Sequence, residues 1–149
     1  MTILHSAIKT PPALHATIVA WYKAALAPLG YKAAASFQND LVIGFADASG
    51  AVEWWVKSTA AESPSHTEED KTAPRIVGSH FAFAAKDRAA VDAFHEAAVA
   101  AGGKSIGAPG VREYGPSYYA AYVLDPVGNN IEAVCMGDQC GKVGSELQD

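Results

Sequence analysis

The stretch Leu124-Asp125-Pro126-Val127-Gly128-Asn129-Asn130-Ile131-Glu132-Ala133-Val134-Cys135 is the part of the chain from which its fold can be worked out. The segment before it, 118–123, is aromatic and β-branched, which is typical of a strand. Pro126 presets the backbone for a turn, and Gly128 tolerates the left-handed conformation that closes it. A second strand follows, so the sequence predicts a β-hairpin whose last strand carries the ionisable Glu132 among apolar neighbours.

The hairpin alone leaves two interpretations of Glu132. Burial of a lone carboxylate costs roughly several kcal/mol unless a cation or hydrogen-bond donors meet it. The same side chain can equally lie on the wet face of a half-buried hairpin. The rest of the sequence must therefore show whether Glu132 is a functional carboxylate or a surface one.

Composition limits the classes of protein that this chain can represent. Of its 149 residues, 50% are hydrophobic and 18% are charged, which predicts a folded domain. The net charge of -5 gives no basic surface for nucleic acid or an anionic membrane. No apolar run reaches the ~18 residues of a membrane helix, and the first residues do not resemble a signal peptide. We therefore expect a cytoplasmic protein with no nucleic-acid or membrane partner.

Two cysteines are too few for a disulfide framework, and their spacing without a second pair argues against a zinc knuckle. We expect Cys135 to be a small strand residue and Cys140 to belong to a polar tail. The helix residues His15 and His95 are expected at the surface or its boundary, and His66 in a solvated linker.

The predicted elements occur twice in the same order. Module one (1–58) contains a strand, a helix and three strands, predicted at Thr2–Ile8, Leu14–Leu26, Tyr31–Ser36, Leu41–Ala46 and Ala51–Lys57. Module two (76–136) repeats this order, with elements at Ile76–Ala85, Arg88–Ala101, Lys104–Ile106 and the hairpin Tyr118–Cys135, and a loop at Gly107–Pro116. A flexible linker (59–75) separates the modules and a polar tail (137–149) follows. The sequence therefore predicts an α+β fold of two βαβββ modules.

Three potential ligands occupy corresponding places in this repeat. His5 and His80 lie in the first strand of their modules, and Glu132 lies in the last strand of module two. Alternation turns Phe81 and Phe83 toward a helix, and His80 toward the opposite side. Two imidazoles and a carboxylate form the ligand set of a divalent-metal site with open positions. The alternative is that each histidine is an ordinary strand residue with its hydrogen bonds satisfied.

These features resemble the vicinal oxygen chelate superfamily, which comprises glyoxalases, bleomycin-resistance proteins and extradiol dioxygenases. The resemblance extends over most of residues 1–136, and it implies a single glyoxalase-like domain over 1–149 whose modules form a cupped mixed sheet with helices outside. By position it implies that His5, His80 and Glu132 bind the metal, which could be Zn, Ni, Fe, Mn or Co. Members bind a substrate through adjacent oxygens and catalyse isomerase, lyase, thiol-addition or dioxygenase reactions. Some members hold no metal and only bind ligands.

The sequence departs from that pattern at the fourth ligand, which glyoxalase-like members carry in the last strand of module one. The offset from the turn glycine points to Trp54, which cannot bind a metal, whereas a turn one residue shorter points to Glu53. Alternation favours Glu53 and Trp55 on the cup side, with Val52, Trp54 and Val56 against the helices. Glu53 is therefore our candidate base or fourth ligand, and the alternative is an exposed glutamate at a strand edge.

The expected lining of the cup is aromatic. Trp55, Tyr114 and Tyr118 are candidates for substrate binding, and Tyr122 for acid–base catalysis; Tyr119 and Tyr122 should lie on opposite faces, so at least one of them packs structurally. The expected cations on this side are Lys9 and Lys57, too few for a transferase acting on a phosphonate. We expect a metal-dependent lyase or isomerase, with a metal-free binding protein or a small dioxygenase as alternatives. The modules would act together, either within one chain or exchanged in a homodimer.

Overall fold

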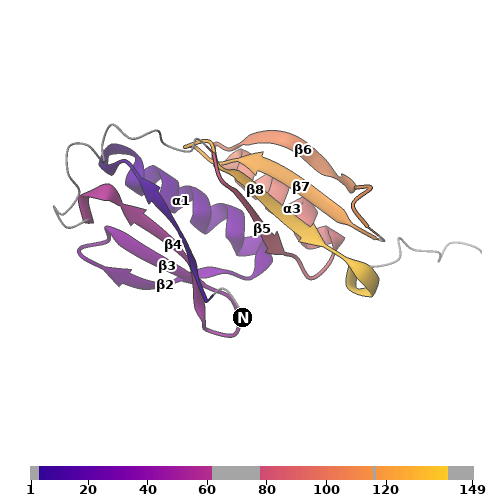
Figure 1. Ribbon diagram of the computed structural model, residues 1–149, viewed down its shortest axis with the longest axis horizontal. Coiled ribbons are helices and arrows are strands. Elements are labelled where there is room, and N and C mark those ends of the chain that lie inside the picture. The colour runs from indigo at the N-terminus through magenta and orange to yellow at the C-terminus, as the bar shows by residue number, and fades with distance from the viewer. Residues whose placement is uncertain (1–3, 62–77, 116, 141–149) are drawn as a thin grey trace, which may run out of the picture.

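The computed structural model describes residues 4–61, 78–115 and 117–140, and it has an α+β fold with two four-stranded mixed sheets (Figure 1). The strands of the first sheet are β1 (Ser6–Thr10), β2 (Lys32–Phe37), β3 (Val42–Ala46) and β4 (Val52–Ser58), in the order β1-β4-β3-β2. Those of the second are β5 (His80–Ala84), β6 (Lys104–Val111), β7 (Tyr119–Leu124) and β8 (Asn130–Cys135), in the equivalent order β5-β8-β7-β6. In each sheet the first strand pairs in parallel with the last, so the predicted βαβββ repeat is confirmed.

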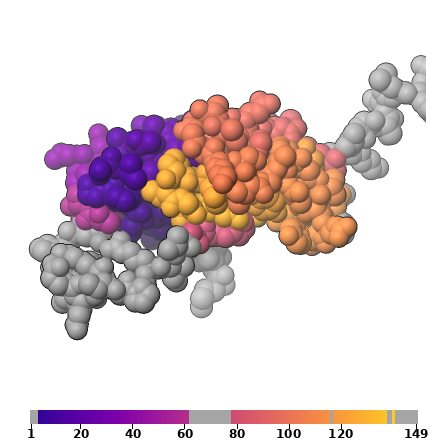
Figure 2. Space-filling model, turned by 90° about the horizontal axis from the view of Figure 1, so that it is seen from above, coloured from indigo at the N-terminus to yellow at the C-terminus, as the bar shows by residue number. Residues whose placement is uncertain are grey.

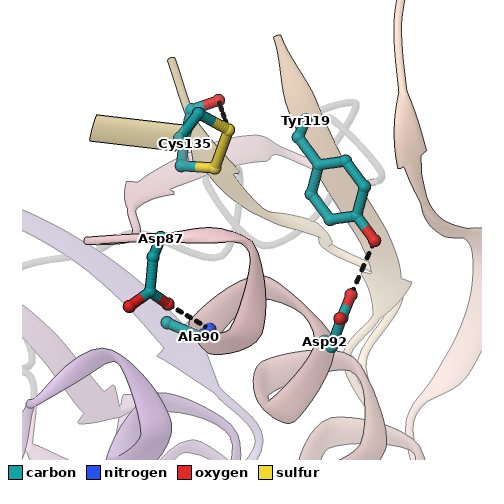
Figure 3. Close-up of a disulfide and its surroundings, with 6 residues drawn as sticks. Asp87, Ala90, Asp92, Tyr119 and Cys135 are labelled. Carbon is teal, nitrogen blue, oxygen red and sulfur yellow. Dashed lines mark hydrogen bonds between the residues drawn. A yellow bond between two sulfur atoms is a disulfide. The ribbon is translucent and has the colours of Figure 1, made fainter. Parts of the chain in front are cut away.

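One α-helix covers one face of each sheet. Helix α1 (His15–Leu26) packs Tyr22 against the buried Phe45 and Trp54 of the first sheet. Helix α3 (Arg88–Ala100) covers β6, β7 and β8, and its first turn is capped by Asp87, whose Oδ1 accepts a hydrogen bond from the amide of Ala90 at 2.8 Å (Figure 3). We call the opposite face of each sheet, which no helix covers, its open face.

The two modules share their core and lie side by side (Figure 2). The indole Nε1 of Trp21 donates to the carbonyl of Ala98 on α3 at 2.9 Å, and the hydroxyl of Tyr22 donates to Asp125 at 2.8 Å. Burial, and then the charge of Asp125, raise the pKa of Tyr22. A side chain at Gly103 would meet Trp21 Nε1 at 2.8 Å, so the close approach of the modules requires glycine there.

The last turn of module two was predicted correctly from the sequence, but the length of β6 was not. The residues Gly107–Val111 were predicted as a loop and instead extend β6, which pairs with β7 in a register that shifts twice. The reason is the ring of Tyr122, because a Cβ at Gly107 would lie 2.6 Å from its Cδ2. The glycine that suggested a loop is therefore needed to let an aromatic ring lie across the strand.

Two further expectations were wrong. His15 is buried: its Nε2 donates to the carbonyl of Asp40 at 2.8 Å, and its Nδ1 lies 2.7 Å from the Thr10 hydroxyl. Cys140 is also buried and forms a disulfide with Cys135 at the end of β8 (Figure 3). The contact of His15 with Asp40 could not be inferred from spacing because the two residues are far apart in the chain, and the disulfide depends on how the chain turns between Cys135 and Cys140.

Some predictions fall on residues outside the described ranges, namely most of the linker with His66, the start of the strand predicted at Ile76, and the tail beyond Cys140. Among the described residues, no helix is long and apolar enough to span a membrane.

Candidate functional site

The open face of the second sheet carries a buried carboxylate beside an exposed imidazole. Oε2 of Glu132 lies 3.0 Å from Nε2 of His80, and the two side chains are 3% and 51% exposed. Their strands are parallel neighbours, and Glu132 stands between Ala82 on β5 and Tyr122 on β7. Because directly paired residues share a face, these side chains lie opposite Phe83 and Ile131, which are buried in the core that the modules share. The predicted facing of β5 and β8 is confirmed.

Tyrosines complete this arrangement. The hydroxyl of Tyr118 donates to Oε1 of Glu132 at 2.6 Å, and this bond, followed by burial, raises the pKa of Tyr118 well above its usual value. Burial and then the Glu132 charge raise the pKa of Tyr122, whose ring lies 6.3 Å from that of His80. Both phenols therefore remain protonated donors at neutral pH. Tyr114 is 77% exposed and packs edge-on against Tyr118, and Tyr119 bonds instead to Asp92 of α3 (Figure 3).

Sequence reasoning missed one cation on this face. The guanidinium of Arg112 lies 5.2 Å from the centre of the Tyr122 ring and is held by the backbone carbonyls of Ala108 and Ala120. Arg112 was assigned to a loop, so its position over β6 and β7 could not be predicted. The expectation that Lys9 and Lys57 were the cations of the open faces was therefore incomplete.

His5 and Glu53 belong to a second cluster, in a cavity between the facing edges of the sheets. The cavity has a volume of about 230 Å³ and is lined by His5, Ser6, Tyr31, Glu53, Trp54, Phe81, Ala82, Phe83 and Ala84. The hydroxyl of Tyr31 donates to Oε2 of Glu53 at 3.3 Å, and burial, followed by the Glu53 charge, raises the pKa of Tyr31 to about 12. His5 immediately precedes β1, whose edge is not paired with β5 in the described part of the chain (Figure 1).

The last strand of module one contains a β-bulge where the fourth ligand was expected. Phe45 pairs with Trp54, but the next residue of β3, Ala46, pairs with Val52, which leaves Glu53 as the extra residue. Trp54 is 3% exposed under α1, and Glu53 is exposed. Val52 was predicted to face the helices, and this was wrong because the bulge turns it to the open face, where its Cγ1 would touch a Cβ at position 44.

Trp55 lies on the open face as predicted, because it pairs with Gly44 and stacks on Phe37 at 6.0 Å. The structure thus brings together His80, Glu132, Tyr118 and Tyr122 in one cluster, and His5 with Glu53 in another. Within residues 4–61, 78–115 and 117–140, no three His, Cys, Asp or Glu side chains converge closely enough to hold a metal ion.

The fold defines a class of small proteins that are built from repeated βαβββ modules. The profile of the Glyoxalase/Bleomycin resistance protein/Dioxygenase superfamily matches residues 16–133, and the chain belongs to that superfamily. No curated protein matches the sequence.

Solved structures agree with this assignment. A glyoxalase/bleomycin resistance protein from Albidiferax ferrireducens is 25% identical, with 89% of this chain and 98% of that chain covered and a TM-score of 0.62. A glyoxalase/bleomycin resistance protein/dioxygenase family enzyme from Burkholderia phytofirmans is 20% identical, with coverages of 90% and 98% and a TM-score of 0.66. Lactoylglutathione lyase from Agrobacterium tumefaciens is 20% identical, with coverages of 89% and 92% and a TM-score of 0.61. The last two structures, at 20% identity, show a similarity of fold alone.

Proposed function

We propose that this protein is a metal-dependent lyase or isomerase that acts on a small molecule chelated through adjacent oxygens. The observation that carries the proposal is the burial of Glu132, a carboxylate that is 3% exposed and that, among the described residues, is bonded by an imidazole and by phenols but by no Lys or Arg. These hydrogen bonds offset part of the cost of burying the carboxylate, and a divalent ion bound there would balance its charge.

The spacing of the two donor atoms also fits an ion. Ligand atoms about 2.1 Å from one ion and at right angles to each other are separated by ~3.0 Å. Nε2 of His80 and Oε2 of Glu132 lie at that separation, 3.0 Å. Tyr118 donates to the other carboxylate oxygen, which fixes the orientation of Glu132 as outer-sphere partners of metal ligands do.

A bound divalent ion would supply Lewis-acid polarisation of the two substrate oxygens. The side chains of the protein would bind the substrate and transfer protons. Trp55, Tyr114 and Tyr118 would contact the substrate, and Tyr122, which remains protonated, would donate a proton or a hydrogen bond to developing negative charge. Glu53, exposed beside His5, is the candidate base.

His5 and Glu53 would complete the ligand set from a second copy of the chain. Among the described residues of one chain the two clusters do not converge closely enough to hold an ion: His5 and Glu53 line the cavity between the edges of the sheets, and Glu132 lies on the open face of the second sheet. Phe37, which is 57% exposed, widens the apolar part of the first sheet's open face. A homodimer that opposes module one of one copy to module two of the other would bury these side chains and bring four donors together.

Metal binding tests the proposal directly. Purified protein is titrated with Co²⁺ and followed by its visible absorption and by calorimetry, and we expect one ion per chain in the wild type and none in His80→Ala. Full occupancy in a His80→Ala, Glu132→Ala double variant would sink the proposal. Binding of catechols or lactoylglutathione by a wild type that binds no ion would support the metal-free binding protein instead.

Complementation tests the second copy. His5→Ala and His80→Ala are mixed after mild unfolding and refolded together, which lets hetero-dimers form. If the donors come from two copies, each hetero-dimer regains one intact site, so that Co²⁺ binding returns to part of its wild-type level. If the mixture binds no more ion than the separate variants, the donors do not come from different copies.

A further inference from the structure

Arg112 has unused hydrogen-bonding capacity beside the candidate site. Its Nη2 donates to the carbonyl of Ala120 at 3.2 Å and to that of Ala108, while its buried Nε has no partner. In the part of the chain that the structure describes, no carboxylate is paired with this guanidinium. The buried Nε is out of reach of a ligand, so the part of the guanidinium that can meet an anion is Nη1, for which the described residues supply no acceptor.

The backbone and the neighbouring ring fix where the guanidinium lies. Gly107 is paired with Tyr122, and a Cβ at Gly107 would also lie 3.4 Å from Nη2 of Arg112. The guanidinium thus lies over the glycine of β6 and the ring of Tyr122, which itself stands directly beside Glu132. It belongs to the same open face as Glu132, two strands away, which corresponds to ~10 Å.

From this arrangement we infer that the substrate carries a carboxylate, or a comparable anionic group, which pairs with Arg112 while its adjacent oxygens lie at His80 and Glu132. Arginine suits this role because its guanidinium stays charged, and Nη1, which has no bonded partner among the described residues, keeps its N–H groups for an anion. The substrate class is therefore an elongated organic acid with a chelating group at one end and a negative charge at the other. This inference rests on the proposed function for its chelating end.

The chain contains a matched control for Arg112. The guanidinium of Arg88 lies 4.9 Å from the centre of the Tyr119 ring and also has a buried Nε without a partner. It begins α3, and Tyr119 bonds to Asp92 on that helix, so Arg88 belongs to the helix side of the second sheet. Replacement of Arg88 removes the same kind of cation–ring contact without touching the open face.

The test compares two probes that differ in one charge. Dihydrocaffeate is a catechol with a carboxylate on a short chain, and propylcatechol is its uncharged counterpart. Dissociation constants are measured by calorimetry for the wild type, Arg112→Gln, Arg112→Lys and Arg88→Gln, with and without Zn²⁺. Thermal unfolding of each variant checks that it is folded.

We expect the wild type and Arg88→Gln to bind dihydrocaffeate at least about tenfold more tightly than propylcatechol, as one charge-assisted contact provides. Arg112→Gln should lose this preference, and Arg112→Lys should retain part of it. Equal affinity of the wild type for the two probes, no binding of dihydrocaffeate, or an unchanged preference in Arg112→Gln would overturn the assignment. A preference that depends on Arg112 but not on Zn²⁺ would keep the anion site and contradict the metal-dependent function.

Discussion

The last strands of the two modules occupy equivalent places but present their acidic residues differently. In module two, β8 is regular, and Glu132 is buried in a row with Ala82 and Tyr122 on the open face. In module one, β4 contains a bulge, Glu53 is the extra residue, and Trp54 is buried under the helix. Glu53 is one residue closer to its turn glycine than Glu132 is. The extra residue of the bulge thus compensates for the shorter spacing between the turn glycine and the glutamate of β4. It leaves the Glu53 carboxylate exposed and less firmly held than that of Glu132.

The comparison is sharpest at the neighbouring tryptophans of β4. Trp54→Ala should lower the free energy of unfolding by about 3–5 kcal/mol, because the indole is buried against Tyr22, Phe81 and Phe83. Trp55→Ala should cost only about 1 kcal/mol, since Trp55 is half-buried on the open face. Urea unfolding measures both, and equal losses would contradict the assignment of the two faces.

The two glutamates should differ in their importance for metal binding. Glu132→Gln should weaken divalent-ion affinity by more than the ~10–100-fold that an outer-sphere change costs. Glu53→Gln should weaken it by less than Glu132→Gln does, because the bulge leaves Glu53 exposed with one bonded neighbour, Tyr31. Calorimetric titration with Zn²⁺ measures both affinities. The reverse order would mean that module one holds the ion more tightly than module two.

Both open faces use a glycine to accommodate an aromatic ring, which allows a parallel test. A Cβ at Gly44 would lie 2.8 Å from the Trp55 ring, and one at Gly107 would lie 2.6 Å from the Tyr122 ring. Alanine at either position should cost about 1–3 kcal/mol, since the ring must move. The control is Gly110→Ala on β6, where the nearest atom is 3.9 Å away and a change within about 0.5 kcal/mol is expected. Equal effects of all three substitutions in urea unfolding would show that ring accommodation is unimportant.

The contact between the modules has a pH-dependent component. Because the pKa of Tyr22 is raised in the folded protein, its contribution is complete below pH ~10 and declines above it, where the phenol of the unfolded chain ionises first. Tyr22→Phe should therefore cost about 1–2 kcal/mol at neutral pH, by removing a donor to the buried Asp125. The difference from the wild type should shrink between pH 7 and pH 11. A difference that grows with pH would refute the role of this bond.

The sequence was informative where one strand and its turn contain the whole signal. Alternation in β5 and β8, together with the turn at Gly128, was enough to place His80 and Glu132 on one face. It failed where the partner strand decides the outcome, as with the bulge beside Val52 and the glycine-rich β6 that precedes Arg112. A bulge and a ring lying over a glycine are properties of a strand pair, and one strand's pattern does not reveal them.

The close approach of Trp21 to Gly103 has a consequence for the evolution of this repeat. Gly103 follows α3 of module two, and a Cβ there would meet Val123 and the carbonyl of Ala98 in its own module as well as Nε1 of Trp21 on α1 of module one. Its own module therefore already excludes a larger residue at 103, and the glycine leaves room for Trp21 to approach and donate to Ala98. Although the modules repeat one plan, a tryptophan of module one lies against a glycine of module two, so relatives that keep Trp21 should also keep Gly103.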